Sequence, residues 1–206
     1  YSIKEFLIYI NSINQTFNGF SYDDVVLDIG GGAGYTSMAF HPLVKAIYLA
    51  DFSAKMIERA KSEMSNFEKA IIYQDSLPDL ASTKQKKIKF SKVTVGSVIQ
   101  YLKGYDEIAR SLDNLFYVLK PGGKVVLTHN PDLGKKNSFI KSYQKLNWPK
   151  NKIENALDYE NKKRFWLSFD IILELSIKAG FSKCEKKLIP EELFQSTHMF
   201  DLLLIK

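Results

Sequence analysis

The 206-residue sequence has little cysteine and no cluster of residues with the spacing of a metal site. Its single cysteine, Cys184, cannot form a disulfide within the chain, and we expect neither a disulfide nor zinc to stabilise the fold. Apolar runs are too short to span a membrane, and Lys4 and Glu5 interrupt the start where a secretory signal would have its apolar core. These absences predict a cytoplasmic protein with no metal and no membrane partner.

Arginine is also scarce, although the chain is basic. The formal net charge is +6 and the pI is near 9.1, yet only Arg59, Arg110 and Arg164 are arginines among the 29 basic residues. A basic surface attracts phosphate groups, but recognition of bases and phosphates favours the flat guanidinium group. A nucleic-acid partner is therefore disfavoured without being excluded, whereas a small anionic molecule fits the charge.

What remains is the composition of an ordinary globular domain, 45% hydrophobic and 25% charged. The length suits one domain that spans residues 1–206. Because the sequence does not begin with methionine, we interpret it as a trimmed or partial product. Apolar residues at positions 3, 6, 7, 10 and 13 predict an amphipathic helix over residues 1–17, inside an N-terminal cap of residues 1–20 that either closes over a substrate or, as we favour, packs on the core.

Short β-branched runs alternate with helical stretches, which is typical of a parallel sheet covered by helices. The expected strands are residues 24–29, 46–50, 69–73, 88–96 and 124–129. The expected helices are residues 34–41, 53–66 and 105–119, and a further helix begins after Ser168 and ends at Gly180. In the second helix Ser53 is the expected N-cap, and the expected inner stripe is Met56, Ile57, Ala60 and Met64.

Residues 25–34 carry the most informative pattern, Val-Val-Leu-Asp-Ile-Gly-Gly-Gly-Ala-Gly. Glycines at a strand-to-helix turn allow a sharp bend and a close approach of the backbone to a ligand. The dinucleotide fingerprint needs a glycine at the sixth position counted from Gly30, but Tyr35 stands there. The pattern is instead Asp-x-Gly-x-Gly-x-Gly, led by Asp28, which argues against a nicotinamide-dependent oxidoreductase.

This pattern resembles the first motif of the class I S-adenosylmethionine-dependent methyltransferases, and three further landmarks follow in the family's order. The strand of residues 46–50 ends at Asp51, and the strand of residues 69–73 delivers Gln74-Asp75-Ser76. Residues 118–127, Val-Leu-Lys-Pro-Gly-Gly-Lys-Val-Val-Leu, resemble the family's turn into its fifth strand, in which Pro121 and Gly122 would fix a tight reversal. The order and the separations make coincidence a poor explanation.

The resemblance implies a doubly wound α/β fold, with a seven-stranded, mostly parallel sheet, an antiparallel last strand and helices on both faces. Residues 182–189 and 198–205 are similar to the family's closing hairpin, whose seventh strand enters between the fifth and the sixth. Residues 131–167, rich in lysine and asparagine, form an insertion that we expect to shape the substrate pocket on this fold.

The resemblance also implies S-adenosylmethionine as the cofactor. Asp51 would accept hydrogen bonds from the ribose hydroxyls, Asp75 with Ser76 would lie beside the adenine, and Ser97 would approach the methionine part. The backbone around Gly30, Gly31, Gly32 and Gly34 would bind the amino-acid end, and Asp28 would brace this loop. Phe52 and Met56 complete the expected cofactor-binding set.

Methyl transfer needs a nucleophile aligned with the methyl group and the exclusion of water. A hydroxyl acceptor also benefits from a base tuned near neutrality, for which histidine is suited. His129, at the end of the fifth strand, is the first candidate, and His198, at the start of the seventh, is the second. Because an antiparallel strand begins where parallel strands end, the two histidines are expected on one face, unless each is an ordinary packed or surface histidine. His41, before Pro42, reads as structural.

The segment after the fourth strand, residues 96–102, departs from two patterns of the family. It lacks the Asn/Asp-Pro-Pro-aromatic cluster of nucleobase methyltransferases, and Tyr101 stands where many relatives have histidine. Tyr101 is our candidate for orienting a substrate, although packing is the favoured alternative.

We predict methyl transfer to a small polar metabolite, at a hydroxyl of a sugar, a sugar nucleotide or a phosphorylated intermediate. An RNA or protein methyltransferase and a non-catalytic cofactor-binding partner subunit remain the alternatives. The sequence does not indicate the oligomeric state.

Overall fold

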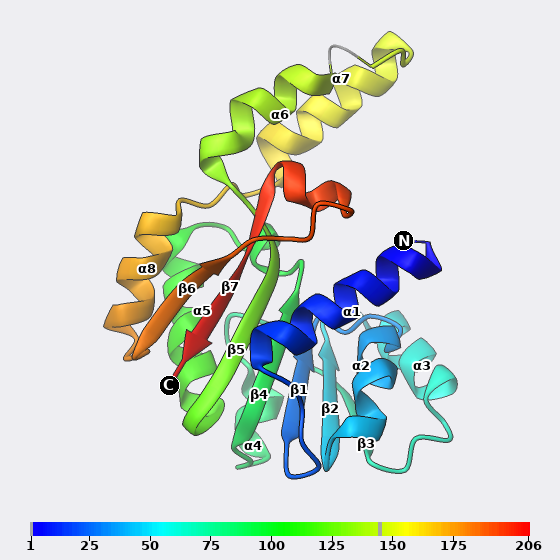
Figure 1. The fold of residues 1–206 in the computed structure, drawn as a ribbon, viewed down its shortest axis with the longest axis vertical. Coiled ribbons are helices and arrows are strands. Elements are labelled where there is room, and N and C mark those ends of the chain that lie inside the picture. Colours follow the sequence, from blue (N-terminus) through cyan, green and yellow to red (C-terminus); the bar gives the residue numbers. More distant parts are fainter. Residues whose placement is uncertain (1, 144–145) are drawn as a thin grey trace.

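The structure, a computed structural model, describes residues 2–143 and 146–206 (Figure 1). In this part of the chain seven strands form one sheet with the order β3-β2-β1-β4-β5-β7-β6. The strands are β1 (Val25–Ile29), β2 (Ala46–Asp51), β3 (Ala70–Gln74), β4 (Phe90–Gly96), β5 (Leu119–Pro131), β6 (Lys183–Lys187) and β7 (Met199–Ile205). The first five strands pair in parallel, and β7 enters antiparallel between β5 and β6. The predicted fold class is confirmed, and so is the predicted entry of the seventh strand between the fifth and the sixth.

Helices cover both faces of the sheet. On one face lie α1 (Ile3–Phe17), α2 (Tyr35–Phe40) and α3 (Ala54–Glu63), and on the other lie α4 (Ala81–Gln85), α5 (Tyr105–Val118) and α8 (Phe169–Lys178) (Figure 1). Each face has its own apolar core, one built around α1 to α3 and the other around α5 and α8. This alternation of buried faces follows from the period of two in each strand.

Helix α1 forms where the apolar periodicity predicts it. Ser2 and Glu5 form a capping box at its start, and Tyr9, Ile13 and Phe17 are buried against the sheet. The predicted stripe is wrong at its first turns, because Ile3 and Leu7 are 81% and 60% exposed. Ile3 lines an open groove between these turns and α2, whereas Phe6, which also lines the groove, packs against the core.

Helix α3 corrects another expectation. The Ser53 side chain accepts a hydrogen bond from the Met56 backbone, as predicted for an N-cap. Ile57, Ala60 and Met64 are buried at the spacing of one helix face, whereas Met56 is 40% exposed. Met56 is one position out of phase with this spacing and therefore does not belong to the inner stripe.

The segment before β5 also differs from its prediction. β5 begins at Leu119, five residues earlier than expected, and the Pro-Gly-Gly segment lies inside it. Leu119 pairs with Phe90 and Lys124 pairs with Lys92, so the residues between them bulge out of the ladder. Gly122 takes a positive φ of 71° within this bulge. The predicted reversal is therefore a bulge within β5, and β5 pairs with β4 on both sides of it.

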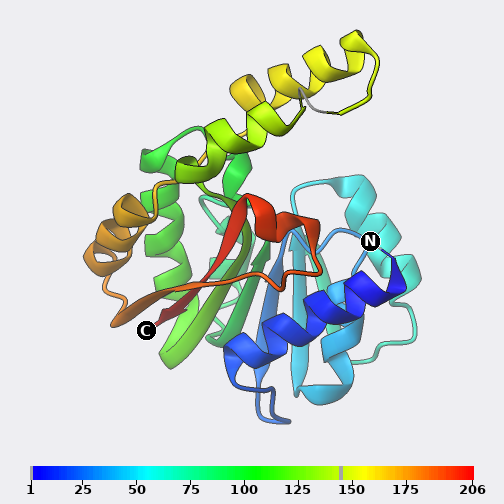
Figure 2. The same cartoon turned by 45° about the horizontal axis from the view of Figure 1, so that its top comes forward.

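The insertion folds into a helical hairpin that projects beyond the carboxyl ends of the parallel strands (Figures 1 and 2). It contains α6 (Lys136–Tyr143), α7 (Lys150–Asp158) and a π-helical turn (Tyr159–Lys163). The sequence predicted an insertion here but not its helices. None of the helices in the described ranges is long and apolar enough to cross a membrane.

Candidate active site

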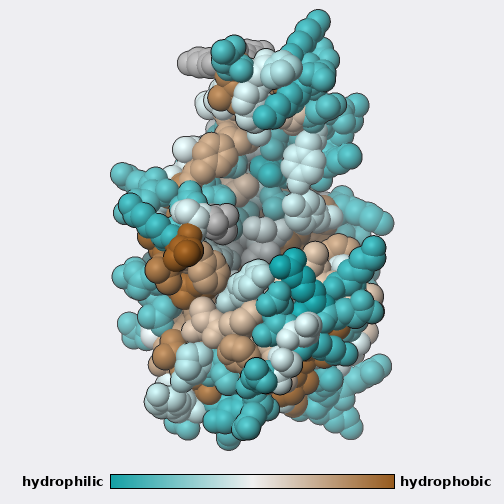
Figure 3. Space-filling model, turned by 90° about the vertical axis from the view of Figure 1, so that its right-hand side faces the viewer, coloured by the Kyte–Doolittle hydropathy of each residue, from teal (hydrophilic) through white to brown (hydrophobic). Residues whose placement is uncertain are grey.

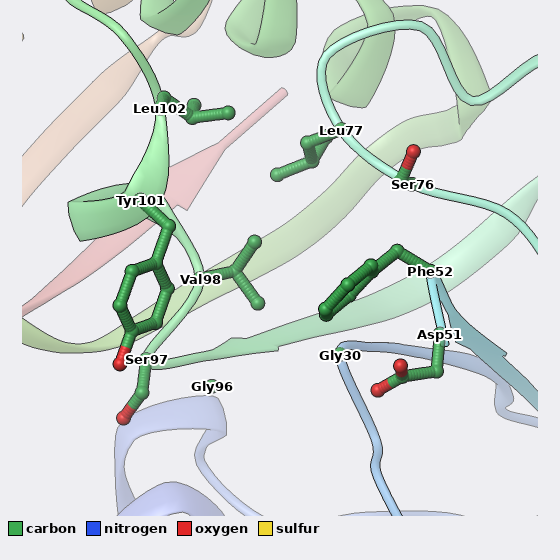
Figure 4. Close-up of a pocket in the computed structure, with 10 residues that line it drawn as sticks. All are labelled: Gly30, Asp51, Phe52, Ser76, Leu77, Gly96, Ser97, Val98, Tyr101 and Leu102. Carbon is green, nitrogen blue, oxygen red and sulfur yellow. The ribbon is translucent and has the colours of Figure 1, made fainter. Parts of the chain in front are cut away.

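A cleft lies at the carboxyl ends of β1, β2 and β4, and we call it the main cleft. Its volume is about 730 Å³, and its walls are Gly30, Asp51, Phe52, Ser76, Leu77, Gly96, Ser97, Val98, Tyr101 and Leu102 (Figure 4). Strand order reverses between β1 and β4, and ligands of open α/β sheets bind at such a switch point. The main cleft therefore lies where proteins with this sheet topology bind their ligands.

A smaller cavity, the inner pocket, adjoins the main cleft. It measures about 180 Å³ and shares Gly30, Gly96 and Ser97 with the main cleft. Its other walls are Tyr9, Asp28, Gly31, Thr36 and His129. The two cavities together run from the end of β3 to the end of β5.

The glycine loop after β1 is shaped by conformations and contacts that only glycine allows. Gly30 has a φ of 72°, and a Cβ atom built there would lie 2.3 Å from Cγ2 of Val98. A Cβ on Gly31 would lie 2.7 Å from Cγ of Leu49. The loop is thus a cradle without side chains at the junction of the two cavities, and this fits the amino-acid end of a nucleotide cofactor.

Asp28 joins the loop to two neighbouring elements. Its buried carboxylate accepts hydrogen bonds from Ser37 of α2 at 2.7 Å and from Thr94 of β4 at 2.8 Å. Burial raises the pKa of Asp28 above its usual value. These contacts tie the end of β1 to α2 and β4, and the role of Asp28 in bracing the loop stays a prediction.

Asp51 ends β2 beside the glycine loop, and its carboxylate points into the main cleft (Figure 4). Oδ2 accepts the Gly32 N–H at 3.0 Å and Oδ1 accepts the Ser53 N–H at 2.9 Å. A carboxylate has about four acceptor positions, so these two bonds leave capacity for two more donors. The residue is suited to hold a pair of hydroxyl groups.

Asp75 does not line either cavity. Its Oδ2 accepts the Thr83 N–H and the Thr83 hydroxyl, both at 2.7 Å, and its Oδ1 accepts the Ser76 N–H at 2.9 Å. The carboxylate thereby orders the loop that presents Ser76 and Leu77 to the main cleft. Met56, the other expected cofactor residue outside the walls, lies on the exposed side of α3.

The apolar walls of the main cleft were missed by sequence reasoning. Leu77, Val98 and Leu102 face the space beside Phe52, whose ring is directed toward them (Figure 4). Such a slot suits a flat ring system. Because these residues carry no reactive group and stand outside the motifs, only their positions just after β3 and β4 signalled a place at the site.

His129 lies in the wall of the inner pocket and is 5% exposed. Its ring stacks on Tyr9, with centroids 4.9 Å apart, and its Nδ1 lies 3.2 Å from the Ser97 hydroxyl oxygen. Burial lowers the pKa of His129 to about 4. The imidazole is therefore uncharged at neutral pH, which is the form that accepts a proton.

His198 lies in different surroundings. Its ring stacks on Phe139 of the hairpin at 3.7 Å between centroids, and its Nδ1 lies 2.8 Å from the Thr197 hydroxyl oxygen. Trp166 and Phe194 complete this aromatic cluster at the base of the hairpin. The two histidines share the strand edge, as predicted, but His198 does not line either cavity and its ring packs between the hairpin and the sheet.

Tyr101 connects the main cleft to the insertion. Its side chain is 59% exposed at the cleft, so core packing is not its role. Its hydroxyl oxygen accepts a hydrogen bond from the Tyr159 hydroxyl of the π-helical turn at 3.1 Å. Desolvation raises the pKa of Tyr101 to about 12, so the phenol stays protonated. The insertion thus reaches the mouth of the site.

Fold and site define a Rossmann-like α/β protein with a nucleotide-cofactor cleft, and comparison with known sequences narrows this class. A family model described as a methyltransferase domain matches residues 27–125. A demethylmenaquinone methyltransferase of Leptospira interrogans is 30% identical over 132 residues, which cover 63% of this chain and 51% of that protein. Chondramide synthase of Chondromyces crocatus is 28% identical over 122 residues, which cover 58% of this chain and 3% of that protein. The chain thus spans at most about half the length of these relatives.

Solved structures share the fold at low identity. Magnesium protoporphyrin IX methyltransferase of Synechocystis, with bound S-adenosylhomocysteine, has a TM-score of 0.70 at 13% identity, and the match covers 97% of this chain and 84% of that one. The N-methyltransferase NodS of Bradyrhizobium japonicum has a TM-score of 0.64 at 14% identity, with 100% and 98% covered. At these identities the likeness shows the fold alone.

The methyltransferase-domain match over residues 27–125 and the seven-stranded fold support a class I, Rossmann-like S-adenosylmethionine-dependent methyltransferase. Its cofactor is S-adenosylmethionine, and the side-chain-free cradle beside Asp51 fits that molecule.

Proposed function

We propose that this chain transfers a methyl group from S-adenosylmethionine to a hydroxyl of a small polar metabolite, such as a sugar, a sugar nucleotide or a phosphorylated intermediate. One observation carries the proposal. The main cleft passes Asp51 and the glycine loop and continues into an inner pocket whose wall holds an uncharged histidine. Donor-binding groups and a proton acceptor therefore lie along one continuous cavity.

In this proposal the residues along the main cleft bind the donor. Asp51 accepts from the ribose hydroxyls, and the slot between Phe52 and Leu77 takes the adenine beside Ser76. The glycine loop meets the methionine end at the junction of the cavities, where no side chain keeps the donor from the backbone. Bound there, S-adenosylmethionine supplies a methyl group already activated by its positive sulfur, so the protein needs no covalent intermediate of its own.

His129 then acts as the base. A hydroxyl oxygen that gains a methyl group must lose its proton, and the uncharged imidazole receives it while the Ser97 hydroxyl holds the ring orientation. A pKa near 4 keeps the ring unprotonated, although it also makes the ring a weaker base than one tuned near neutrality. The low exposure of the ring keeps water from competing with the acceptor.

The acceptor side is the mouth of the cleft beneath the hairpin. The hydroxyls of Tyr101 and Tyr159 meet there, and the face is hollowed below the largely hydrophilic hairpin (Figure 3). Two relatives are named for demethylmenaquinone and magnesium protoporphyrin, which differ from each other and from a sugar. The acceptor proposal therefore rests on the polar mouth and the basic hairpin rather than on the relatives.

Two measurements test the function in sequence. Calorimetry of the folded protein should show binding heat with S-adenosylmethionine and with S-adenosylhomocysteine, and its absence for both would overturn the donor site. A screen of metabolite pools with methyl-labelled donor should then find a labelled small molecule. Label that appears only with a partner protein supplying the active site would instead identify a non-catalytic subunit.

The basic insertion favours an RNA methyltransferase as the second candidate. Residues 131–167 contain nine basic and four acidic residues, while the rest of the chain is nearly balanced. An RNA acceptor predicts transfer of label to RNA and binding that weakens steeply as salt rises. Transfer of label to RNA would support the RNA methyltransferase. RNA binding without transfer of label would support the small-molecule acceptor.

A further inference from the structure

Strand β5 is irregular just where it enters the site. Leu127 pairs with Leu202 of β7, and the next pair is Asn130 with Phe200, so three steps along β5 match two along β7. His129 lies within this extra step with a φ of 58°, in the left-handed region that residues other than glycine rarely adopt. The site therefore contains a β-bulge with a strained histidine.

The bulge changes the direction of the His129 side chain. In a regular strand consecutive side chains point to opposite faces of the sheet. Here two consecutive residues, Thr128 and His129, both contact Tyr9 of α1. The Thr128 hydroxyl lies 3.0 Å from the Tyr9 hydroxyl, and the His129 ring stacks on the Tyr9 ring. The bulge thus brings His129 to the face of α1, where it lines the inner pocket.

Asp201 of β7 is bonded directly to this bulge. Its Oδ1 accepts the backbone N–H of His129 at 2.7 Å, and the residue is 4% exposed. Asn130 assists from the other side, since its amide group donates to the carbonyls of Leu127 and Phe200. Asp201 and Asn130 together provide the hydrogen bonds that the interrupted ladder does not.

No ion pair among the residues that the structure describes accounts for the buried Asp201 carboxylate. The residue opposite Asp201 on β6 is Lys187, and the Lys187 ammonium group lies 2.6 Å from a carboxylate oxygen of Glu185. Burying a carboxylate is costly unless it accepts hydrogen bonds that the fold needs. The hydrogen bond from the His129 backbone N–H, at a residue with left-handed backbone, is one that the fold needs.

We propose that Asp201 is a positioning residue, whose buried carboxylate holds the β-bulge of β5 and thereby sets the His129 ring in the wall of the inner pocket. The proposal rests on the proposed function for the meaning of that pocket. It concerns the resting protein, so it can be tested without donor or acceptor.

The chain has three histidines, which makes the ring protons of His129 simple to follow by NMR. A His129→Gln variant assigns the signal. In the unmodified protein the Tyr9 ring current should move the His129 ring protons upfield, and Asp201→Asn, which keeps an oxygen acceptor, should preserve that shift. Asp201→Leu removes the acceptor and should move the signal most of the way to that of an exposed histidine. Asp132→Leu, a matched change at the same edge of the sheet, should leave it in place.

A second readout covers the case in which Asp201→Leu does not fold. The backbone amide proton of His129 should shift downfield as the Asp201 carboxylate ionises, and this titration should vanish in Asp201→Asn. A folded Asp201→Leu with an unmoved His129 ring would overturn the proposal, as would an amide titration that Asp201→Asn retains. Both readouts use the protein without donor. The result for Asp201 therefore stands even if the protein fails to bind S-adenosylmethionine.

Discussion

The backbone N–H of Gly32 donates to Oδ2 of Asp51 at 3.0 Å, so the glycine loop and the end of β2 are joined beside the main cleft. The two strongest sequence motifs are thus one structural unit. A change at either residue should affect donor binding through the other.

Replacing Asp51 should weaken donor binding. We expect Asp51→Ala to lower the affinity for S-adenosylhomocysteine at least tenfold, because hydrogen bonds to a charged group contribute about 1.5–3 kcal/mol each. Isothermal calorimetry measures the effect. Asp79→Ala, which removes an exposed carboxylate in the loop between β3 and α4, is the control and should change little. Equal affinities in the two variants would remove Asp51 from the site.

Gly30 offers a test of the close contact in the loop. Gly30→Ala should lower stability by roughly 1–3 kcal/mol and reduce donor affinity, because its Cβ would meet Val98 and its φ is positive. Gly122→Ala is a matched control, since Gly122 has a similar φ of 71° but open space around it. Thermal unfolding and calorimetry of both variants separate the clash from the backbone strain. Similar losses in both would mean that the Val98 contact does not matter.

His129 should matter for turnover rather than for donor binding. His129→Ala should lower turnover at least about a hundredfold while leaving the affinity for S-adenosylhomocysteine nearly unchanged. His198→Phe, which keeps an aromatic ring stacked on Phe139, should remain active. Both are measured with the acceptor identified by the labelled-donor screen. Full turnover in His129→Ala would show that the reaction uses no base at this position.

Asp201 should make stability depend on pH. Burial raises the pKa of Asp201 to about 7 from a usual value of 3.8, so between these values the folded state holds a proton that the unfolded state has lost. Stability should therefore fall as pH rises through this window, and the full cost should be present above about pH 8. Asp201→Asn lacks the ionisation, and its stability relative to the unmodified protein should rise by roughly 1–4 kcal/mol between pH 4 and pH 8.

The difference between the two proteins is the quantity to measure in that titration. His129 and His198 have lowered pKa values of about 4 and therefore destabilise the folded state as pH falls below 6.5. Their contribution is common to both proteins and cancels in the difference. Denaturant unfolding at several pH values gives the result, and a flat difference would show that Asp201 keeps an ordinary pKa.

Tyr101 should act on the acceptor. Tyr101→Phe removes the hydroxyl that accepts from Tyr159, and we expect the KM for the acceptor to rise severalfold with donor affinity unchanged. Steady-state kinetics with the identified acceptor tests this. Tyr22→Phe, at a similarly exposed tyrosine outside both cavities, is the control. An unchanged KM would restrict Tyr101 to a contact between cleft and hairpin.

The sequence by itself determined the fold class and pointed to several walls of the main cleft, namely Gly30, Asp51, Phe52, Ser76 and Ser97, because these depend on local patterns. Alternating strands and helices predicted the sheet, and the loop after Asp28 with the acid at Asp51 predicted where a cofactor belongs. The helical periodicity wrongly put Met56 in the buried stripe of α3. A helix of ten residues has too few apolar positions to fix which face is buried.

Only the tertiary structure decided the inner pocket. Tyr9 meets Thr128 across 119 positions of sequence, and Asp201 meets His129 across 72. No local pattern encodes such contacts, because they arise when α1 packs on the sheet and β7 pairs beside β5. The same pairing separates the two histidines, since the bulge brings His129 to the cavity while the hairpin covers His198.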